Sequence, residues 1–163
     1  MLANNRMTYN SVLITCFNNR SNQYTCDNLA GYNDHLQENP NMVEDIGKYG
    51  QQIKPVFDID AYDSDINKSE VIADINKVFP NKSIYYAKRD PREYKGKMKY
   101  SYRFYVDGVR ISSKNLKALL ITNEFDKNKI YDMSIYDKNK VLFLPLTTKK
   151  ADNTTIPALV PID

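Results

Sequence analysis

The sequence predicts an α+β fold in which a largely antiparallel central sheet is flanked by helices. Strand-like segments alternate with segments of helical spacing through the last two-thirds of the chain. One strand-like segment, residues 100–107, alternates so regularly between two faces that it favours a half-exposed antiparallel sheet over a buried parallel one. The 163 residues, 42% apolar and 26% charged, suffice for a single domain with one core.

The chain begins with a polar, asparagine-rich segment, residues 1–50, which is either separate from the main domain or part of it. Its short apolar run, residues 12–14, is a candidate strand. We expect an intracellular, soluble protein without a membrane partner, because no signal peptide is evident and no apolar run approaches the roughly 18–20 residues of a membrane span. Two cysteines and one histidine cannot supply the about four ligands of a closed zinc site.

The main folded unit is expected over residues 51–163. Residues 53–60, IKPVFDID, read as a buried strand, in which Pro55 is tolerable near the start or on an edge. A helix is predicted to follow over residues 64–79. Its defining residues are the apolar Ile72, Ile75 and Phe79, the alternative N-caps Ser64 and Asn67, and the terminating Pro80.

The middle of the unit predicts two strands joined by a charged connection. Residues 83–88 form a short strand candidate, and residues 89–99 form the connection. The next strand, residues 100–107, separates its side chains into two sets. One face carries Tyr100, Tyr102, Phe104 and Val106, and the other carries Ser101, Arg103, Tyr105 and Asp107.

The last third predicts a second helix and two further strands. The helix runs from Ser113, its expected N-cap, to Phe125. A strand is expected over residues 130–136, a turn over residues 137–139 and a final strand over residues 141–146. The buried stripe of the helix is formed by Leu116, Leu119 and Leu120.

The sharpest chemical feature is the pair Asp58 and Asp60. Residues two apart on a strand project from the same face, so both carboxylates point one way. Their mutual repulsion and partial burial call for a neutralising cation. Mg²⁺ or Mn²⁺ suits such oxygen ligands, and two ions about 3.5–4 Å apart can clamp a phosphoryl displacement. The alternative is that both acids are simply solvated at a strand end, beside Asp63 and Asp65.

A third acid, Asp132, lies in a strand-like segment with apolar neighbours and is the best candidate to complete a triad. The alternative for Asp132 is again an acid at a strand end. Asp107 and Asp137 are weaker candidates, because turn chemistry explains both.

Basic residues supply a second candidate set. Arg103 shares a strand face with Ser101 and the preceding Lys99, and together they could offer donors to a triphosphate. Lys149 follows the last strand and is a further nucleotide-binding candidate. The remaining cations are expected to form only a diffuse surface for a nucleic-acid backbone. These are Lys88, Arg89, Arg92 and Lys150.

Taken in order, these segments resemble the three motifs of the archaeo-eukaryotic primase superfamily, especially primase-polymerases and the primase domains of large DNA viruses. VFDIDAYD (56–63) resembles the first motif, a hydrophobic strand ending in D-x-D. KYSYRFYVDG (99–108) resembles the second, and YDMSIYDKNKVLFLPLTTKK (131–150) resembles the third. The likeness spans about residues 53–150.

The resemblance implies a primase-polymerase-like, RRM-like catalytic core. It implies that two Mg²⁺ or Mn²⁺ ions are held by three metal ligands and that three other residues face nucleotide or template. The implied metal ligands are Asp58, Asp60 and Asp132, and the implied nucleotide-facing residues are Lys99, Ser101 and Lys149. Implied partners are a single-stranded DNA template, nucleoside triphosphates and a replicative helicase. If the protein is viral, the implied location is the host cytoplasm or a viral replication site.

Two positions depart from the family pattern. Arg103 stands where the family has a phosphate-contacting histidine, and Phe143 stands where it has an arginine. Arginine still binds phosphate but does not exchange protons as histidine does. The leading expectation is template-directed nucleotidyl transfer in viral or mobile-element DNA replication. A catalytically impaired module that binds nucleic acid or a replication partner is the first alternative, and a metal-dependent nuclease is the second.

Overall fold

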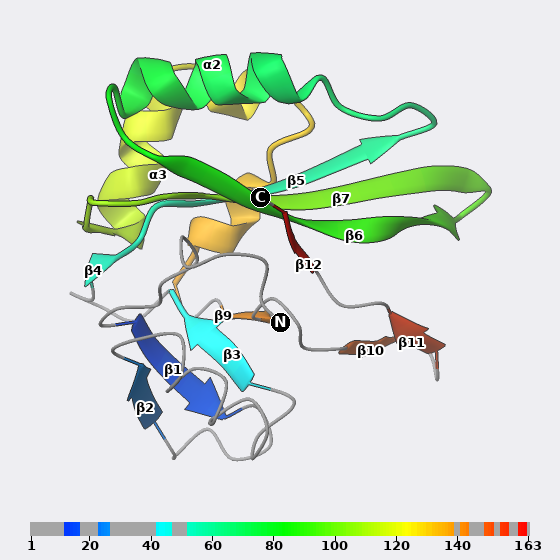
Figure 1. Ribbon diagram of the computed structural model, residues 1–163, viewed down its shortest axis with the longest axis horizontal. Helices are drawn as coiled ribbons and strands as arrows, with labels where there is room; N and C mark the ends of the chain where they lie inside the picture. Colours follow the sequence, from blue (N-terminus) through cyan, green and yellow to red (C-terminus); the bar gives the residue numbers. More distant parts are fainter. Residues whose placement is uncertain are drawn as a thin grey trace.

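The chain folds as α+β, with antiparallel sheets and, among the residues described, two α-helices (Figure 1). The computed structural model describes residues 12–16, 23–26, 42–46, 52–138, 141–143, 149–151, 154–156 and 160–162. Side chains are described for Ile46 and residues 52–138. None of the described helices has the length and apolar character needed to cross a membrane.

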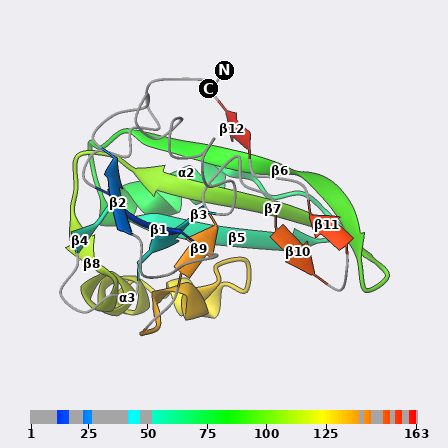
Figure 2. The ribbon, with the colours of Figure 1, turned by 90° about the horizontal axis from the view of Figure 1, so that it is seen from below.

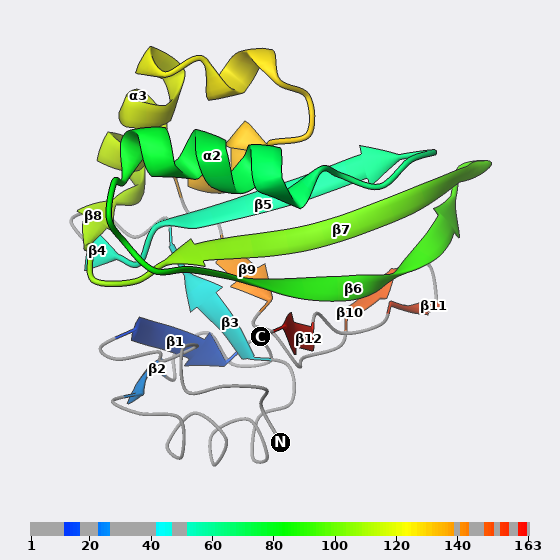
Figure 3. The same ribbon diagram turned by 45° about the horizontal axis from the view of Figure 1, so that its top comes forward.

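The main sheet has the strand order β12-β6-β7-β5. Its strands are β5 (Val56–Tyr62), β6 (Ile84–Tyr94), β7 (Lys97–Val106) and β12 (Val160–Ile162). One face is covered by α2 (Lys68–Val78), and α3 (Ser113–Thr122) lies beside the β5 edge (Figures 1 and 3). The antiparallel arrangement predicted from residues 100–107 is therefore confirmed.

Smaller sheets lie on the other side of the main sheet, as Figure 2 shows from below. The first contains β1 (Val12–Cys16), β2 (Gln23–Cys26), β3 (Met42–Asp45) and β9 (Val141–Phe143). The second pairs β10 (Lys149–Ala151) with β11 (Thr154–Ile156). A two-stranded pair of β4 (Gln52–Ile53) and β8 (Ile111–Ser112) precedes α3. The strand expected at residues 12–14 is confirmed as part of β1, whereas residues 144–146 of the last predicted strand lie outside the described part.

Burial on both sides of the sheet corrects one expectation. Every residue of β7 from Ser101 to Val106 is buried, so the prediction of a half-exposed sheet is wrong. The alternation along residues 100–107 does divide the side chains between two faces, but the side chains of residues 101–106 are buried on both. The helix-covered face carries apolar and aromatic side chains. The face toward the smaller sheets carries polar and charged side chains beside the buried Val56, Tyr85 and Tyr105.

The core lies between the sheet and α2. Phe57 of β5 is its aromatic centre, with ring centroids 5.7 Å from Phe125, 6.4 Å from Tyr131 and 6.5 Å from Phe79. These separations lie within the range in which aromatic pairs attract one another. The α2 residues that complete this core are Val71 and Ile75, both buried.

Capping residues define where both helices begin. The Asn67 side chain accepts hydrogen bonds from the N–H groups of Ser69 and Glu70, so the cap of α2 is Asn67 rather than the alternative Ser64. Ser112, not the predicted Ser113, caps α3 by accepting from the Asn115 N–H at 3.3 Å.

The predicted end of the second helix also needs correction. α3 ends at Thr122, and Glu124 adopts a left-handed conformation with φ of 63°. Phe125 therefore falls in a separate short 3₁₀ helix, η1 (Phe125–Lys127). This break turns the Phe125 ring toward Phe57.

Two segments differ from their predicted conformations. Residues 89–99 are not an irregular connection, because β6 and β7 continue through them as a long hairpin that turns at Lys95 and Gly96, both at positive φ. Residues 130–136 are not a strand. Only Tyr131 forms an isolated bridge, and residues from Met133 to Tyr136 form the 3₁₀ helix η2. Asp132 caps η2 through its side chain, which favours a turn over strand extension.

Asp107, a weaker acid candidate, has a structural partner instead. The Lys54 ammonium, buried at 6% side-chain exposure, lies 3.3 Å from its carboxylate. Partial burial would raise the pKa of Asp107, but the charge of Lys54 and hydrogen bonds from Lys54, Tyr85 and the Gly108 N–H together hold the pKa below the usual value. The carboxylate is 46% exposed, which moderates the energy of this pair.

We expect Asp107→Ala to lower the free energy of unfolding by about 1–2 kcal/mol at pH 7, because the buried ammonium of Lys54 loses an ion pair. The depressed pKa means that this contribution is present above the unfolded-state value and is lost as pH falls through the folded-state value. Urea unfolding at pH 7 and at pH 3.5 measures both effects. Asp126→Ala, at an exposed position, is the control; equal losses in the two variants would contradict the role of Lys54.

Candidate functional site: a charged face of the main sheet

The register between β5 and β7 places Asp58 opposite Arg103 and Asp60 opposite Ser101. Directly opposed residues in an antiparallel pair lie on the same face. Both carboxylates therefore project toward the smaller sheets, while Phe57 and the other odd-numbered residues of β5 pack into the core.

Each carboxylate has a close donor from β7. The Arg103 Nε donates to Oδ1 of Asp58 at 3.3 Å, and the Ser101 hydroxyl donates to Oδ1 of Asp60 at 2.6 Å. The Lys99 ammonium lies 3.6 Å from the other oxygen of Asp60. Side-chain exposure is 6% for Arg103 and 23% for Asp58, so this ion pair is largely withdrawn from water.

Asp132 reaches the same face through the outer edge of β5. Its N–H donates to the Asp58 carbonyl at 3.0 Å, and the Asp60 N–H donates to the Ile130 carbonyl at 3.0 Å. Tyr131 forms an antiparallel bridge with Ile59, which puts Asp132 beside Asp58 on one face. The Asp132 carboxylate accepts from the Ser134 N–H and hydroxyl at 3.0 and 2.6 Å.

The electrostatics agree with this proximity. Burial raises the pKa of Asp58, Arg103 opposes the rise, and the negative charges of Asp60 and Asp132 reinforce it. Burial also raises the pKa of Tyr136, and the carboxylates of Asp58 and Asp132 add to that shift. The three acids thus form one interacting group even though they come from two separate segments.

A second guanidinium lies on this face. Arg89 of β6 stands opposite Ser101 and is 7% exposed. Burial lowers the pKa of Arg89, Arg103 lowers it further, and Asp58 opposes the shift. We call this set the charged face. It comprises Asp58, Asp60, Arg89, Lys99, Ser101, Arg103 and Asp132.

Sequence reasoning placed Arg89 only on a diffuse surface. Its signal was present, because Arg89 continues the period-two series of Tyr85 and Ala87 along β6. Lys149 begins β10, which lies on the same side of the main sheet, but its side chain is outside the described part. The side chain of Phe143, in β9, is likewise not described.

The carboxylates suit a divalent cation by their chemistry. They are hard oxygen donors, they lie together, and burial makes the negative charge of Asp58 costly, which a cation would relieve. Among residues with described side chains, however, no group of three or more His, Cys, Asp or Glu is spaced to hold a metal ion. Arg103 and Lys99 neutralise two of the acids, and Ser134 binds the third.

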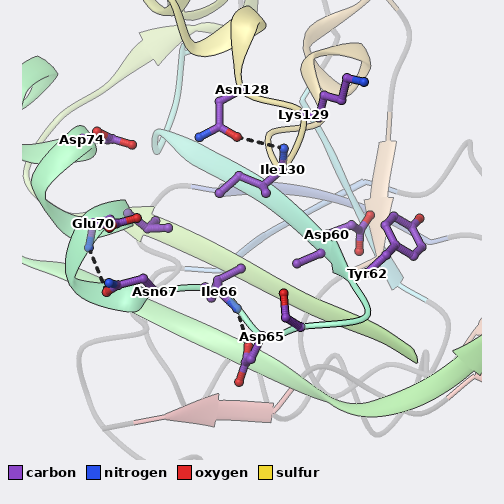
Figure 4. A pocket seen from close by; sticks show the side chains of 13 residues that line it. Asp60, Tyr62, Asp65, Ile66, Asn67, Glu70, Asp74, Asn128, Lys129 and Ile130 are labelled. Atoms are coloured by element: carbon purple, nitrogen blue, oxygen red, sulfur yellow. Dashed lines mark hydrogen bonds between the residues drawn. The ribbon is translucent and has the colours of Figure 1, made fainter. Parts of the chain in front are cut away.

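A cleft of about 590 Å³ opens beside Asp60, between the start of α2 and residues 128–130 (Figure 4). Four carboxylates line it against one ammonium, that of Lys129. The acids are Asp60, Asp65, Glu70 and Asp74. This excess of negative charge disfavours phosphate groups, so an anionic ligand would find its cationic partners on the charged face instead.

Comparison with known proteins adds no relative. Neither a scan against protein-family models nor a search of curated proteins found a match. What remains to indicate a function is the motifs of the sequence and the geometry of the charged face.

The position of Asp132 depends on Tyr136. The buried Tyr136 hydroxyl donates to the Val56 carbonyl at 2.6 Å and so ties η2 to β5. We expect Tyr136→Phe to lower the free energy of unfolding by about 1–2 kcal/mol, because the buried carbonyl loses its donor. Urea denaturation provides the measurement. Tyr62→Phe, which removes a hydroxyl from an exposed ring, is the control; a Tyr136→Phe protein as stable as wild type would refute this role.

Proposed function

We propose that this chain is a template-directed nucleotidyltransferase of the primase-polymerase kind, acting by a two-metal mechanism in viral or mobile-element DNA replication. The observation that carries the proposal is the meeting of Asp58, Asp60 and Asp132 on one sheet face. These acids come from segments that resemble the first and third primase motifs. The cations opposite them come mainly from the segment that resembles the second motif.

In this proposal Asp58, Asp60 and Asp132 hold two Mg²⁺ or Mn²⁺ ions. When bound, the ions would activate the 3′-hydroxyl of the growing strand and neutralise the triphosphate. Ser101 orients the Asp60 carboxylate by its 2.6 Å hydrogen bond. Limited water around the half-buried acids and the buried arginines strengthens the charge interactions there.

The cations of the charged face then serve the nucleotide. Arg103 and Arg89 present planar guanidinium groups, which bind phosphate oxygens in pairs, and Lys99 adds a point charge. With a metal ion held by Asp58, the Arg103 guanidinium would contact phosphate in place of that carboxylate. The charges of the acids and cations would thus be balanced both with and without the metal ion and the phosphate.

Asp58→Asn and Asp60→Asn should each lower Mn²⁺-dependent incorporation of labelled nucleotides on a primed template about a thousand-fold or more, because a metal ligand is lost. Incorporation is followed by extension of an end-labelled primer. The matched control is Asp126→Asn, an exposed acid in η1, which should retain wild-type incorporation.

Incorporation that survives both ligand changes would overturn the assignment. Template degradation without added nucleotides, lost in both variants, would instead identify the nuclease alternative. Thermal unfolding of each variant checks that the fold is retained.

A second candidate function follows from the ion pairs themselves. With Arg103 on Asp58 and Lys99 on Asp60, the face is already neutralised without metal. Arg103 also replaces the histidine of the resembled family. These observations favour a catalytically impaired module that binds nucleic acid or a replication partner. Calorimetric titration of Mn²⁺ with and without a nucleoside triphosphate separates the two functions, because only the enzyme requires bound Mn²⁺.

A further inference from the structure

Exposed apolar side chains gather at the far end of the β6–β7 hairpin. Within residues 52–138, the exposed large apolar side chains are Tyr62 at 43%, Tyr94 at 36%, Met98 at 41% and Ile121 at 46%. Ile121 lies on α3, and the other three lie at the hairpin end or on the β5 end beside it. The rings of Tyr62 and Tyr94 are 6.4 Å apart, so they form one surface.

A bulge in β6 puts Tyr94 on this surface. Arg89 stands opposite Ser101, but Arg92 rather than Pro91 stands opposite Lys99, so β6 contains one additional residue. A one-residue change of register moves every later side chain to the other face. Without the bulge, Tyr94 would project toward the helix-covered face. With it, Arg92 and Tyr94 continue the charged face along the hairpin.

Cations surround the two rings. The Arg92 guanidinium carbon lies 5.3 Å from the centroid of Tyr94, and the ammonium groups of Lys95 and Lys99 lie 5.2 and 4.9 Å from it. Lys99 also lies 5.8 Å from the Tyr62 centroid. Arg92 Nε is buried and has no hydrogen-bond partner among the residues described.

Acids also lie near this surface. Lys97 lies 3.9 Å from Asp63, but both side chains are more than 60% exposed, so the pair is weak. Asp90 and Glu93 are further exposed acids of β6, and Lys99 also lies 3.6 Å from Asp60. Four cations, Arg92, Lys95, Lys97 and Lys99, therefore share this end of the hairpin with three exposed acids. The cations nearest the Tyr94 ring are Arg92, Lys95 and Lys99.

The surface is continuous with the charged face and becomes more open toward the turn. Along β7, Arg103 is 5% and Ser101 6% exposed, whereas the side chain of Lys99 is 13% and that of Lys97 61% exposed. Figure 3 shows the hairpin extending beyond α2 at this end. A long ligand that reaches the acids would therefore pass over Tyr62 and Tyr94.

We propose that Tyr62 and Tyr94, with Arg92, Lys95 and Lys99, form a stacking platform for single-stranded nucleic acid, namely the DNA template. Bases of an unpaired strand expose faces that stack on aromatic rings, while surrounding cations bind the phosphates. The choice of a DNA template as the ligand rests on the proposed function. The place where it binds is inferred separately, from the two rings and the cations around them. Binding here needs neither a metal ion nor a nucleoside triphosphate.

The test is fluorescence anisotropy of a labelled oligothymidylate in EDTA, so that it is independent of catalysis. We expect Tyr94→Ala to weaken binding about ten-fold and Tyr62→Ala/Tyr94→Ala to weaken it further, because each ring stacks on a base. Tyr94→Trp should restore near wild-type affinity. Ile121→Ala is the matched control, since it removes an equally exposed apolar side chain from α3 and should leave affinity unchanged.

Several outcomes overturn the platform. These are wild-type protein that binds no oligonucleotide at low salt, Tyr94→Ala protein that binds like wild type, or Ile121→Ala protein that is weakened equally. Displacement of the oligonucleotide by polyglutamate of matched charge would show that only charge is recognised and would also overturn it. An oligouridylate arm reports whether RNA binds as well; RNA bound in place of DNA would refute a DNA template.

Failure of the proposed function gives a different result. Oligonucleotide affinity that depends on Tyr94, in a protein without incorporation, would retain the platform and reject the enzyme. Nucleotide incorporation that requires Asp58 but is unchanged by Tyr94→Ala would retain the enzyme and reject the platform. Thermal unfolding of the tyrosine variants confirms that they remain folded.

Discussion

The register between β5 and β7 is the constraint on which the rest of the site depends. It sets Asp58 against Arg103 and Asp60 against Ser101, and it sets Phe57 against Phe104 on the opposite face. A slip of one residue would place the acids in the apolar core and the phenylalanine among charges. The free energy that resists such a slip comes from burial of the aromatic core. The core therefore specifies the positions of the charges.

The charged face is costly to fold, and its acids and bases are arranged to limit that cost. Asp58, Arg89 and Arg103 lie largely out of water, where an isolated charge is expensive. Ion pairing across the β5–β7 register offsets part of this cost, while burial still raises the pKa of Asp58. Such residual electrostatic strain is expected where a binding site is kept ready for a ligand. A cation on the acids or a phosphate on the arginines would relieve it.

Local patterns in the sequence predicted the features that depend on local periodicity. The spacing of Asp58 and Asp60 gave their common face, and the spacing of Ile72, Ile75 and Phe79 gave α2. What could not be predicted depends on contacts distant in sequence. Charged residues and Pro91 made the end of the β6–β7 hairpin look like an irregular connection. Strand propensity is a weak guide there, because pairing between the two strands determines the conformation. The bridge between Tyr131 and Ile59, which places Asp132 beside Asp58, involves a single residue pair and so has almost no periodic signal in the sequence. The turn that begins at Asp132 makes the segment harder still to recognise.

The division of the sheet into an apolar and a charged face also explains how one small domain can hold a demanding site. Alternation along β5 and β7 lets Phe57 and Phe104 pack in the core while Asp58 and Arg103 lie on the other face. Substitutions among the acids therefore leave the side chains that pack around Phe57 unchanged. The bulge in β6 extends the same division along the hairpin, because it returns Arg92 and Tyr94 to the charged side. A single sheet thus joins half-buried carboxylates to exposed aromatic rings.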